Sequence, residues 1–234
     1  MHATPFEPWP QTPEDLIRLQ EELAQAEVPL WRPEETLQTA AGCFVCFPRE
    51  RTGGGAAGEP GWAAAVLLVA GEVAATEVVH GQAPAPYIPG LLALREGPLL
   101  EAAVRRLPQQ PQMLIVNATG RDHPRRAGLA LHLGARLDLP TVGVTRRPLL
   151  AEGDPPPDAA GATSPLRIGA EVVGLWLRTK RGARPLAIHP AWRTDAHTAV
   201  EVVMALTTRW RTPEPLRLAR RAARLARDRG IRGV

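Results

Sequence analysis

The stretch MLIVNATGRDHPRRAGLALHLGARLDLPTVGV, residues 113–144, decides the expected fold. It begins with Met113–Val116, a short and fully apolar run of the kind that forms a strand buried on both faces of a sheet. Residues 125–137 then alternate apolar and basic side chains at helical spacing, and residues 141–144 form a second apolar run. This alternation of strands and a helix predicts an α/β fold.

The flanking sequence continues the same pattern. Thr12 followed by Pro13 predicts a helix start, with the hydroxyl as cap and proline in the first turn. Gly71 predicts a hairpin between two strands. Further strands are expected at 41–47, 63–70, 73–80, 172–177 and 186–188, and further helices at 91–107, 195–210 and 214–229. We therefore expect one domain, residues 1–234, with a central mixed sheet flanked by helices.

Several segments of this expected domain are predicted to be irregular. Residues 1–10 are expected to be a loose N-terminal tail, and residues 152–165 a surface loop rich in proline and glycine. Residues 49–61 are glycine-rich and are expected to form a flexible connection. Pro98 is expected to break or restart the helix in which it lies, because proline cannot donate the helical hydrogen bond.

Composition limits the class of protein. The chain has a formal net charge of +4, and Lys180 is its only lysine, so arginine carries almost all of the positive charge. Arginine suits phosphate because its planar fork makes two parallel hydrogen bonds, although the nucleotide composition of a genome can produce the same bias. No apolar run is long enough to span a bilayer, and no signal pattern is present at the N-terminus. We expect a cytoplasmic protein with no membrane partner.

The two cysteines, Cys43 and Cys46, lie three residues apart in an apolar stretch, with no second pair to complete a zinc site. On a strand, positions three apart point to opposite faces. The pattern therefore predicts two buried thiols rather than a disulfide or a shared metal, in keeping with a reducing compartment.

Three segments together resemble one enzyme family. Residues 86–96 read PYIPGLLALRE, residues 116–126 read VNATGRDHPRR and residues 140–144 read PTVGV. In order and spacing these segments resemble endonuclease V, and the similarity extends from about residue 14 to about residue 218. The resemblance implies an RNase H-like fold. It also implies cleavage of nucleic acid near a deaminated adenine (inosine) with a magnesium or manganese ion.

The segment Pro86, Tyr87, Ile88 and Pro89, followed by Gly90, resembles the family's wedge, which separates strands beside the lesion. Two prolines stiffen such a loop, and an aromatic and an aliphatic side chain can replace base stacking. The resemblance thus assigns these five residues to nucleic-acid binding. A rigid loop that caps the core is the structural alternative.

The same resemblance assigns further residues to nucleic-acid binding. Gly120 and His123 belong to the second segment, and Arg125 and Arg126 follow them directly. Arg146 lies just after the third segment, where the family carries lysine. Positive charge at these positions is expected to hold phosphate.

The catalytic positions implied by the resemblance are mostly altered. Phe44 stands where the family's first aspartate belongs, Asn117 replaces its second, and Trp192 aligns with its histidine. Residues 118 and 119 replace a glycine and a histidine, and only Glu96 is retained. Holding magnesium requires several hard oxygen ligands, which a phenyl ring cannot supply and a neutral amide supplies only in part.

A rebuilt metal site is the alternative. Asp122, His123, Asp195 and His197 are candidate ligands, since they lie close in sequence to the altered positions. His123 already belongs to the retained motif, and Asp195 equally suits a helix cap.

The last helix carries arginines on one face. Their spacing suits a stripe that contacts phosphate, and it equally suits a solvated surface helix. The residues are Arg217, Arg220, Arg221, Arg224 and Arg227.

The sequence therefore predicts an endonuclease V-like pseudoenzyme that binds nucleic acid, DNA or RNA, at deaminated or unpaired bases. No cofactor is expected. Two alternatives stay open: a divergent endonuclease that uses Mg²⁺ or Mn²⁺ in a rebuilt site, and a protein-interaction or regulatory module. The sequence does not decide between DNA and RNA, or the oligomeric state.

Overall fold

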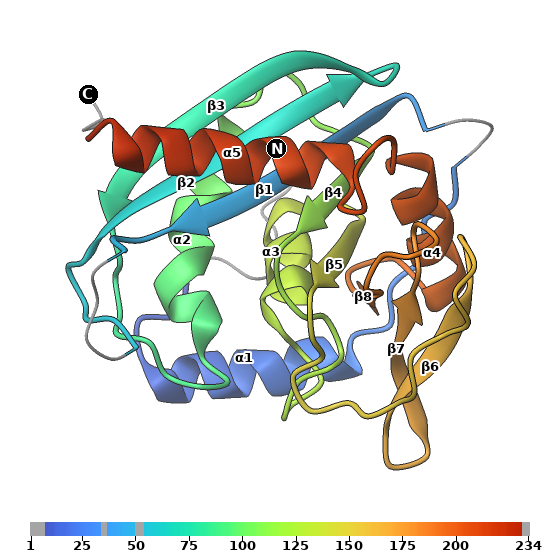
Figure 1. Cartoon of the computed structure of the whole chain (residues 1–234). Coiled ribbons are helices and arrows are strands. Elements are labelled where there is room, and N and C mark those ends of the chain that lie inside the picture. Colours follow the sequence, from blue (N-terminus) through green and yellow to red (C-terminus); the bar gives the residue numbers. More distant parts are fainter. Residues whose placement is uncertain (1–7, 34–36, 50–53, 231–234) are drawn as a thin grey trace.

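One mixed sheet organises the molecule (Figure 1). The structure is a computed structural model that describes residues 8–33, 37–49 and 54–230. In these residues the chain forms an eight-stranded sheet, in the order β3-β2-β1-β4-β5-β8-β7-β6, and five helices. The strands are β1 (Thr39–Cys46), β2 (Pro60–Val69), β3 (Glu72–Gln82), β4 (Met113–Val116), β5 (Thr141–Thr145), β6 (Thr163–Ile168), β7 (Glu171–Leu177) and β8 (Leu186–Pro190). The helices are α1 (Pro13–Gln25), α2 (Leu92–Arg105), α3 (Leu129–Leu137), α4 (Ala196–Ala205) and α5 (Glu214–Asp228).

The centre of the sheet is parallel, and its two sides are antiparallel. Cys43 of β1 pairs with Val116 of β4, which pairs in turn with Gly143 of β5, and all three strands run in the same direction. β2 and β3 extend the sheet beyond β1, and β8, β7 and β6 extend it beyond β5. Because parallel strands end at the same edge, the residues that follow β4 and β5 lie near the end of β1.

Helices cover both faces of the sheet, as expected for an α/β fold. α2 packs against β1, β2 and β3, and α3 against β5 on the same side, whereas α5 packs against β1 and β2, and α4 against β7 and β8. Figure 1 shows α5 crossing in front of β1 and β2. Along β1, Cys43 points into the core beneath α2 and Cys46 packs beneath α5. The two thiols are therefore on opposite faces, both buried and free, as predicted.

Gly42 fixes the distance between β1 and α5. A Cβ atom at this position would lie 2.3 Å from the backbone carbon of Pro215 and 2.4 Å from the backbone nitrogen of Leu216. Such contacts are far inside van der Waals distance, so only glycine permits the first turn of α5 to lie on the strand. This close contact sets where the later turns of α5 fall over the end of β1.

Three expectations about helices were wrong. α4 ends at Ala205, five residues before the expected end at 210. α2 runs through Pro98 without a break, because burial of neighbours such as Leu99 and Leu100, each contributing about 1.5 to 3 kcal/mol, offsets the roughly 3 kcal/mol cost of an interior proline. α3 begins at Leu129 instead of residue 125. The positive φ of Arg126 (57°) ends any helical run before that point.

The expected loop at residues 152–165 is shorter than predicted. β6 begins at Thr163, and Glu152 already pairs with Arg167 in an isolated bridge. β6 includes Pro165, and it is the edge strand of the sheet, where proline is tolerated. The expected connection at 49–61 falls partly outside the described residues, and its last two residues open β2.

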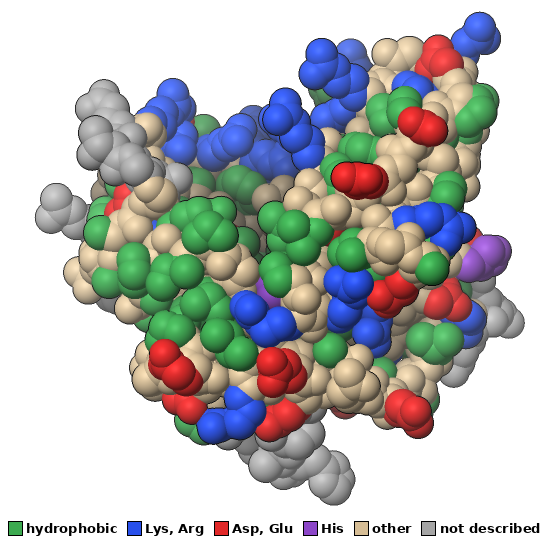
Figure 2. Space-filling view, turned by 90° about the horizontal axis from the view of Figure 1, so that it is seen from below, with side chains coloured by type: hydrophobic (Ala, Val, Ile, Leu, Met, Phe, Trp, Pro, Cys, Tyr) green, Lys and Arg blue, Asp and Glu red, His purple; other side chains and the backbone are tan. Residues whose placement is uncertain are grey.

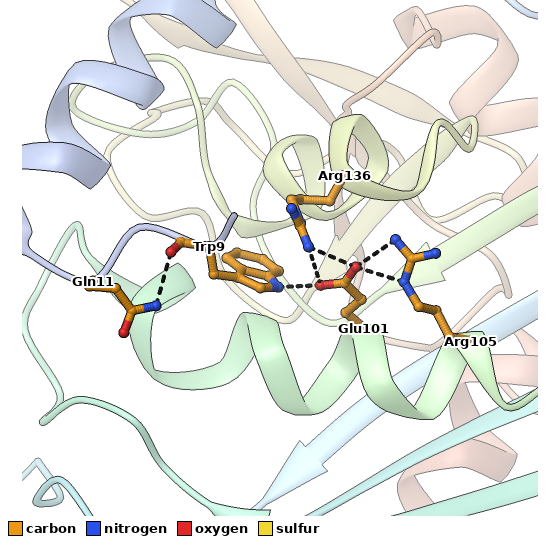
Figure 3. Close-up of polar contacts among 5 residues, drawn as sticks. All are labelled: Trp9, Gln11, Glu101, Arg105 and Arg136. Carbon is orange, nitrogen blue, oxygen red and sulfur yellow. Dashed lines mark hydrogen bonds and ion pairs between the residues drawn. The ribbon is translucent and has the colours of Figure 1, made fainter. Parts of the chain in front are cut away.

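The expected loose tail at residues 1–10 was wrong for Trp9, while residues 1–7 lie outside the described part of the chain. Trp9 Nε1 donates to Glu101 Oε2, and its ring stacks on His132 with centroids 4.6 Å apart. Glu101 also accepts from Arg136 Nη2 at 3.0 Å and from Arg105 Nε at 2.7 Å (Figure 3). This network joins the segment before α1 to α2 and α3.

The described residues include no helix that is both long enough and apolar enough to cross a membrane.

Candidate nucleic-acid site

A pocket of about 170 Å³ opens beside the predicted wedge. It lies where residues after β4 and β5 meet the start of α2. Figure 2 shows a hollow bordered by hydrophobic side chains, with Lys and Arg side chains gathered along the edge above it. The pocket is lined by Gln20, Tyr87, Ile88, Gly90, Leu92, Ala93, Asn117, Ala118, Thr119, His123, Leu129, Thr145 and Leu149.

The wedge segment presents two large side chains to solvent. Tyr87 is 46% exposed and Ile88 is 36% exposed, although both are apolar enough to favour burial. The backbone beneath them is fixed, since Tyr87 N donates to Gly55 O at 3.0 Å and Leu91 N donates to Ile88 O at 3.0 Å. Gly90 has a φ of +78°, which favours glycine and turns the chain into α2. The wedge is therefore a rigid loop with an exposed aromatic and aliphatic tip.

The carbonyl of Gly90 holds this loop against the second predicted motif. It accepts from Arg125 Nη2 at 2.9 Å and from Gln20 Nε2 at 3.2 Å, and it lies 3.0 Å from His123 Nε2. Burial is the main reason that the pKa of His123 is lowered to about 4, so the ring is neutral at pH 7. His123 thus positions the wedge and lines the pocket.

Two of the arginines predicted to hold phosphate are occupied by protein contacts. Besides Gly90, Arg125 binds the side chain of Gln20 through Nε at 2.7 Å. Arg126 Nε donates to Glu171 Oε2 at 2.7 Å. Both side chains hold loops together, whereas Arg146 is exposed just after β5.

Gly120 allows the backbone between β4 and α3 to pass close to β8. A Cβ atom there would lie 2.2 Å from Pro190 O, and its own carbonyl accepts from Gly128 N at 2.8 Å. The strand end at Asn117 is thereby kept beside β8 and the pocket.

The positions that the resemblance assigns to the metal are filled by an aromatic ring, an amide and an arginine. Phe44 lies at the end of β1, half-buried, and packs against α5. Arg220 Nη2 donates to Asn117 Oδ1 at 2.8 Å, and its Cζ lies 5.2 Å from the centroid of the Phe44 ring. Arg224 Cζ lies 5.7 Å from the same centroid. The amide oxygen that remained as a potential metal ligand therefore binds a guanidinium group.

Positive charge concentrates at this point. Burial is the main cause that lowers the pKa of Arg220 to about 10, and repulsion from Arg146, Arg224 and Arg211 lowers it further. The pKa of Arg211 is lowered in the same way, by burial and then by Arg146 and Arg184. These guanidinium groups remain protonated at pH 7, so the site is strongly cationic.

Glu96, the retained family residue, lies on α2 and is half-buried. Its charge acts on Cys43, whose pKa is raised mainly by burial and secondarily by Glu96. Across residues 8–33, 37–49 and 54–230, no three His, Cys, Asp or Glu side chains come together as a metal site.

Trp192 does not join Phe44 and Asn117. It is 7% exposed and packs in the core beneath α2 and α3, the face opposite to that of Phe44. Its backbone N–H donates to Thr141 Oγ1 at 3.0 Å, and its Nε1 donates to Asp138 Oδ1 at 3.3 Å. Arg220 is the residue that the structure brings to the altered metal position instead.

The candidate ligands for a rebuilt site are placed in structural roles. The side chain of Asp122 is fully buried and accepts three backbone N–H groups, from Leu149 at 2.6 Å, Leu150 at 2.8 Å and Ala151 at 2.9 Å. Asp195 caps α4 by accepting from Thr198 N at 2.8 Å, as the capping alternative predicted.

His197 and Asp195 have further partners of their own. His197 is exposed and pairs with Glu201 on the same helix at 3.4 Å. Asp195 also binds Arg32, whose hydrogen bond is the main reason that the pKa of this carboxyl lies well below its ordinary value.

Sequence reasoning placed Arg220 in the α5 stripe but missed its contact with Asn117. Helical spacing alone does not reveal which arginine faces the sheet. The signal that was available is Gly42, which marks the point where α5 approaches β1. Arg211, in the segment before α5, carried no sequence signal.

Comparison with known proteins identifies the family. The family model for Endonuclease V matches residues 23–221. The endonuclease V of Methanopyrus kandleri is 40% identical over 210 residues, which cover 89% of this chain and 86% of the relative. The crystal structure of endonuclease V from Streptomyces avermitilis superposes with a TM-score of 0.84 at 34% identity, and covers 99% of this chain and 100% of that one.

A more distant structure has a bound nucleic acid. Endonuclease V from Ciona intestinalis, in complex with a 24mer DNA containing an inosine followed by a ribo-adenosine, has a TM-score of 0.77 at 18% identity and covers 92% of this chain and 98% of that one. At this identity the likeness concerns the fold alone. The family match and the similarity over most of the chain confirm both the resemblance and the RNase H-like α/β fold. This chain belongs to the endonuclease V family.

Proposed function

We propose that this member of the endonuclease V family binds nucleic acid and does not cleave it by the family's metal-dependent reaction. The observation that carries the proposal is the hydrogen bond from Arg220 to Asn117, together with the position of the Arg220 guanidinium group over the Phe44 ring. The guanidinium group of Arg220 lies where the family resemblance implies a divalent cation. The Phe44 ring beside it cannot be a metal ligand.

The residues present do not suit magnesium or manganese. Either ion needs several oxygen ligands, and the charge of carboxylates usually offsets its own. Asn117 offers one neutral oxygen that already accepts from Arg220, and Arg224 and Arg146 add further positive charge. A divalent ion at this position would be repelled by the guanidinium groups of Arg220, Arg224 and Arg146.

The wedge and the pocket support binding of an unpaired base. The pocket volume of about 170 Å³ is below the roughly 300 Å³ at which pockets for drug-sized ligands begin, so it suits one flat ring system. Apolar walls from Leu92 and Leu129 suit the face of a base, and the amide of Asn117 can bond its edge. His123 borders the base with its ring, because its two nitrogens already bond Gly90 and Arg125. Tyr87 stands outside the pocket, where it can stack on the neighbouring base.

The class of partner follows from the same features together with the family. A deaminated or mismatched base is easier to extrude than a paired one, so a pocket for a single base favours such sites. The inosine-containing DNA bound by the Ciona relative is a partner of that kind, and we extend it to this chain as part of the proposal. DNA and RNA are both compatible with the pocket.

Binding and cleavage assays test the proposal directly. Fluorescein-labelled single-stranded and duplex oligonucleotides, of DNA and RNA and with or without one inosine, are mixed with the full chain in EDTA, magnesium or manganese. Anisotropy measures binding, and denaturing gels measure cleavage. We expect binding in all three conditions, tighter with inosine, and uncut strands. Metal-dependent cleavage that Glu96→Ala abolishes would refute the proposal and favour the divergent nuclease.

The interaction-module alternative predicts the opposite salt behaviour. Contacts to phosphate release counterions, so affinity for nucleic acid falls steeply with salt. A protein whose pocket serves another protein would bind oligonucleotides weakly. Wild-type dissociation constants measured from 50 to 200 mM salt therefore separate the two.

A further inference from the structure

The arginines of α5 divide into two groups according to what they contact. Arg217 binds Glu214 through Nε at 2.9 Å, and Arg227 binds Asp228 through Nε at 3.0 Å, so both charges are paired within the helix. Arg221 is exposed on the outer side. Arg220, by contrast, faces the end of β1, where its Cζ lies over Phe44. The stripe predicted from sequence is therefore two different surfaces.

Arg220 is a partly buried cation, and within the described part of the chain the groups it contacts are neutral or positively charged. Its hydrogen-bond partner is the neutral Asn117 amide, and the charged groups that shift its pKa are the three arginines Arg146, Arg224 and Arg211. Like charges and burial both disfavour this arrangement in the free protein. An anion bound beside Arg220 would offset both the repulsion between the arginines and the cost of burying a charge. Such an arrangement is typical of a site preorganised to bind an anion.

The cationic group is continuous with the base pocket. Asn117, which accepts from Arg220, lines the pocket, and so does Thr145, the residue directly before Arg146. A base in the pocket would thus have its own backbone within one nucleotide of these arginines. Figure 2 shows Lys and Arg side chains along the edge of the hollow.

We propose that Arg220 and Arg146, supported by Arg211, bind one backbone phosphate of the nucleic-acid strand whose base enters the pocket, at the position where the family resemblance implies a divalent cation. This inference rests on the proposed function and adds to it the group that takes over the role of the ion in binding. Arg220 supplies a planar fork that suits two phosphate oxygens. Binding by this site requires no divalent ion.

The test uses the full chain and three substitutions of matched chemistry. Arg220→Gln removes the charge but keeps a polar side chain. Arg146→Gln removes a charge that is exposed to solvent. Arg221→Gln is the control, since it removes one charge from the outer side of the same helix. Thermal unfolding verifies that each variant folds.

Binding to a short single strand with one central inosine is measured by anisotropy in EDTA between 50 and 200 mM salt. Arg220→Gln and Arg146→Gln are expected to weaken binding by roughly tenfold or more, the loss for one charge-assisted hydrogen bond. Each should lower the salt slope by about 0.7, the value for one phosphate of a single strand. Arg221→Gln should change affinity by less than about threefold. EDTA should not weaken wild-type binding.

A neutral methylphosphonate placed in turn at each backbone position locates the contact. At one position next to inosine it should weaken binding of the wild type and have little further effect on Arg220→Gln. If Arg220→Gln and Arg146→Gln behave like Arg221→Gln while the wild type binds without cutting, the phosphate site is wrong and the proposed function stands. If the wild type fails to bind, or binds only with magnesium and cuts, both are wrong. Equal weakening by methylphosphonate at every position also contradicts a single site.

Discussion

Replacing Asp122 by asparagine tests how the wall of the pocket is held. The Asp122 carboxylate is fully buried and accepts from the backbone N–H groups of Leu149, Leu150 and Ala151 at 2.6 to 2.9 Å. Asparagine keeps one oxygen and replaces the other with an NH₂ group, which cannot accept. At least one N–H group that is buried or partly buried then loses its partner, and the remaining hydrogen bonds are weaker because their acceptor is no longer charged.

The magnitude follows from these contacts. A buried donor without a partner costs about 1 to 3 kcal/mol, and a hydrogen bond to a charged group is stronger than a neutral one by about 1 kcal/mol. The neutral asparagine no longer has the desolvation cost of a buried charge, and this offsets part of the two losses. We therefore expect Asp122→Asn to lower the free energy of unfolding by about 3 kcal/mol. Because Leu149 lines the pocket, affinity for an inosine-containing strand should fall as well.

Urea denaturation at pH 7, followed by tryptophan fluorescence, measures the change. Asp154→Asn is the matched control, because Asp154 is exposed in the same region and binds Ser164 through its backbone oxygen, which the substitution keeps. A free energy of unfolding for Asp122→Asn within about 1 kcal/mol of wild type would show that these three bonds do not hold the loop.

Three further substitutions have defined outcomes. Gly42→Ala should destabilise the fold by about 3 kcal/mol in urea, since its Cβ would overlap the backbone of α5. The pKa of His132, lowered by burial to about 3, lies below its unfolded value, so its contribution to stability is complete above pH 6.5 and is lost as the pH falls toward 3. His132→Phe should therefore reduce the loss of stability between pH 7 and pH 5 by about 2 kcal/mol, whereas the exposed His197→Gln should not; equal pH profiles would contradict this. Asn117→Asp should pair with Arg220, stabilise the fold by about 1 kcal/mol, weaken oligonucleotide binding in anisotropy assays and leave the strand uncut; tighter binding would contradict the phosphate site.

The sequence predicted the layers of the fold well because burial leaves a periodic pattern. Apolar runs such as Met113–Val116 and the opposite orientation of Cys43 and Cys46 follow directly from strands covered on both faces. The errors arose where tertiary contacts overrule local preference. Pro98 stays inside α2 because the helix is buried, and Pro165 is accepted at the edge of the sheet.

The candidate site was predicted in part. Family motifs singled out residues 86–90 and Asn117, which border one pocket, and Phe44, which lies near Asn117 through Arg220. The sequence could not show that Trp192 faces the opposite side of the sheet. It also could not show that Arg125 is bound to Gln20 while Arg220 lies over Phe44. These pairings join residues more than 100 positions apart, and they follow from how α1 and α5 pack in the fold.

The placement of α5 has a consequence for synthesis of the chain. The strand that carries Phe44 lies near the middle of the sheet, yet the helix that covers its outer face follows all eight described strands along the chain and leaves the ribosome after them. Until then, the apolar surface of β1 and β2 remains uncovered on the nascent polypeptide, a state prone to aggregation. Premature termination before residue 214 would leave that surface bare, so truncated products should be recovered with chaperones or in inclusion bodies.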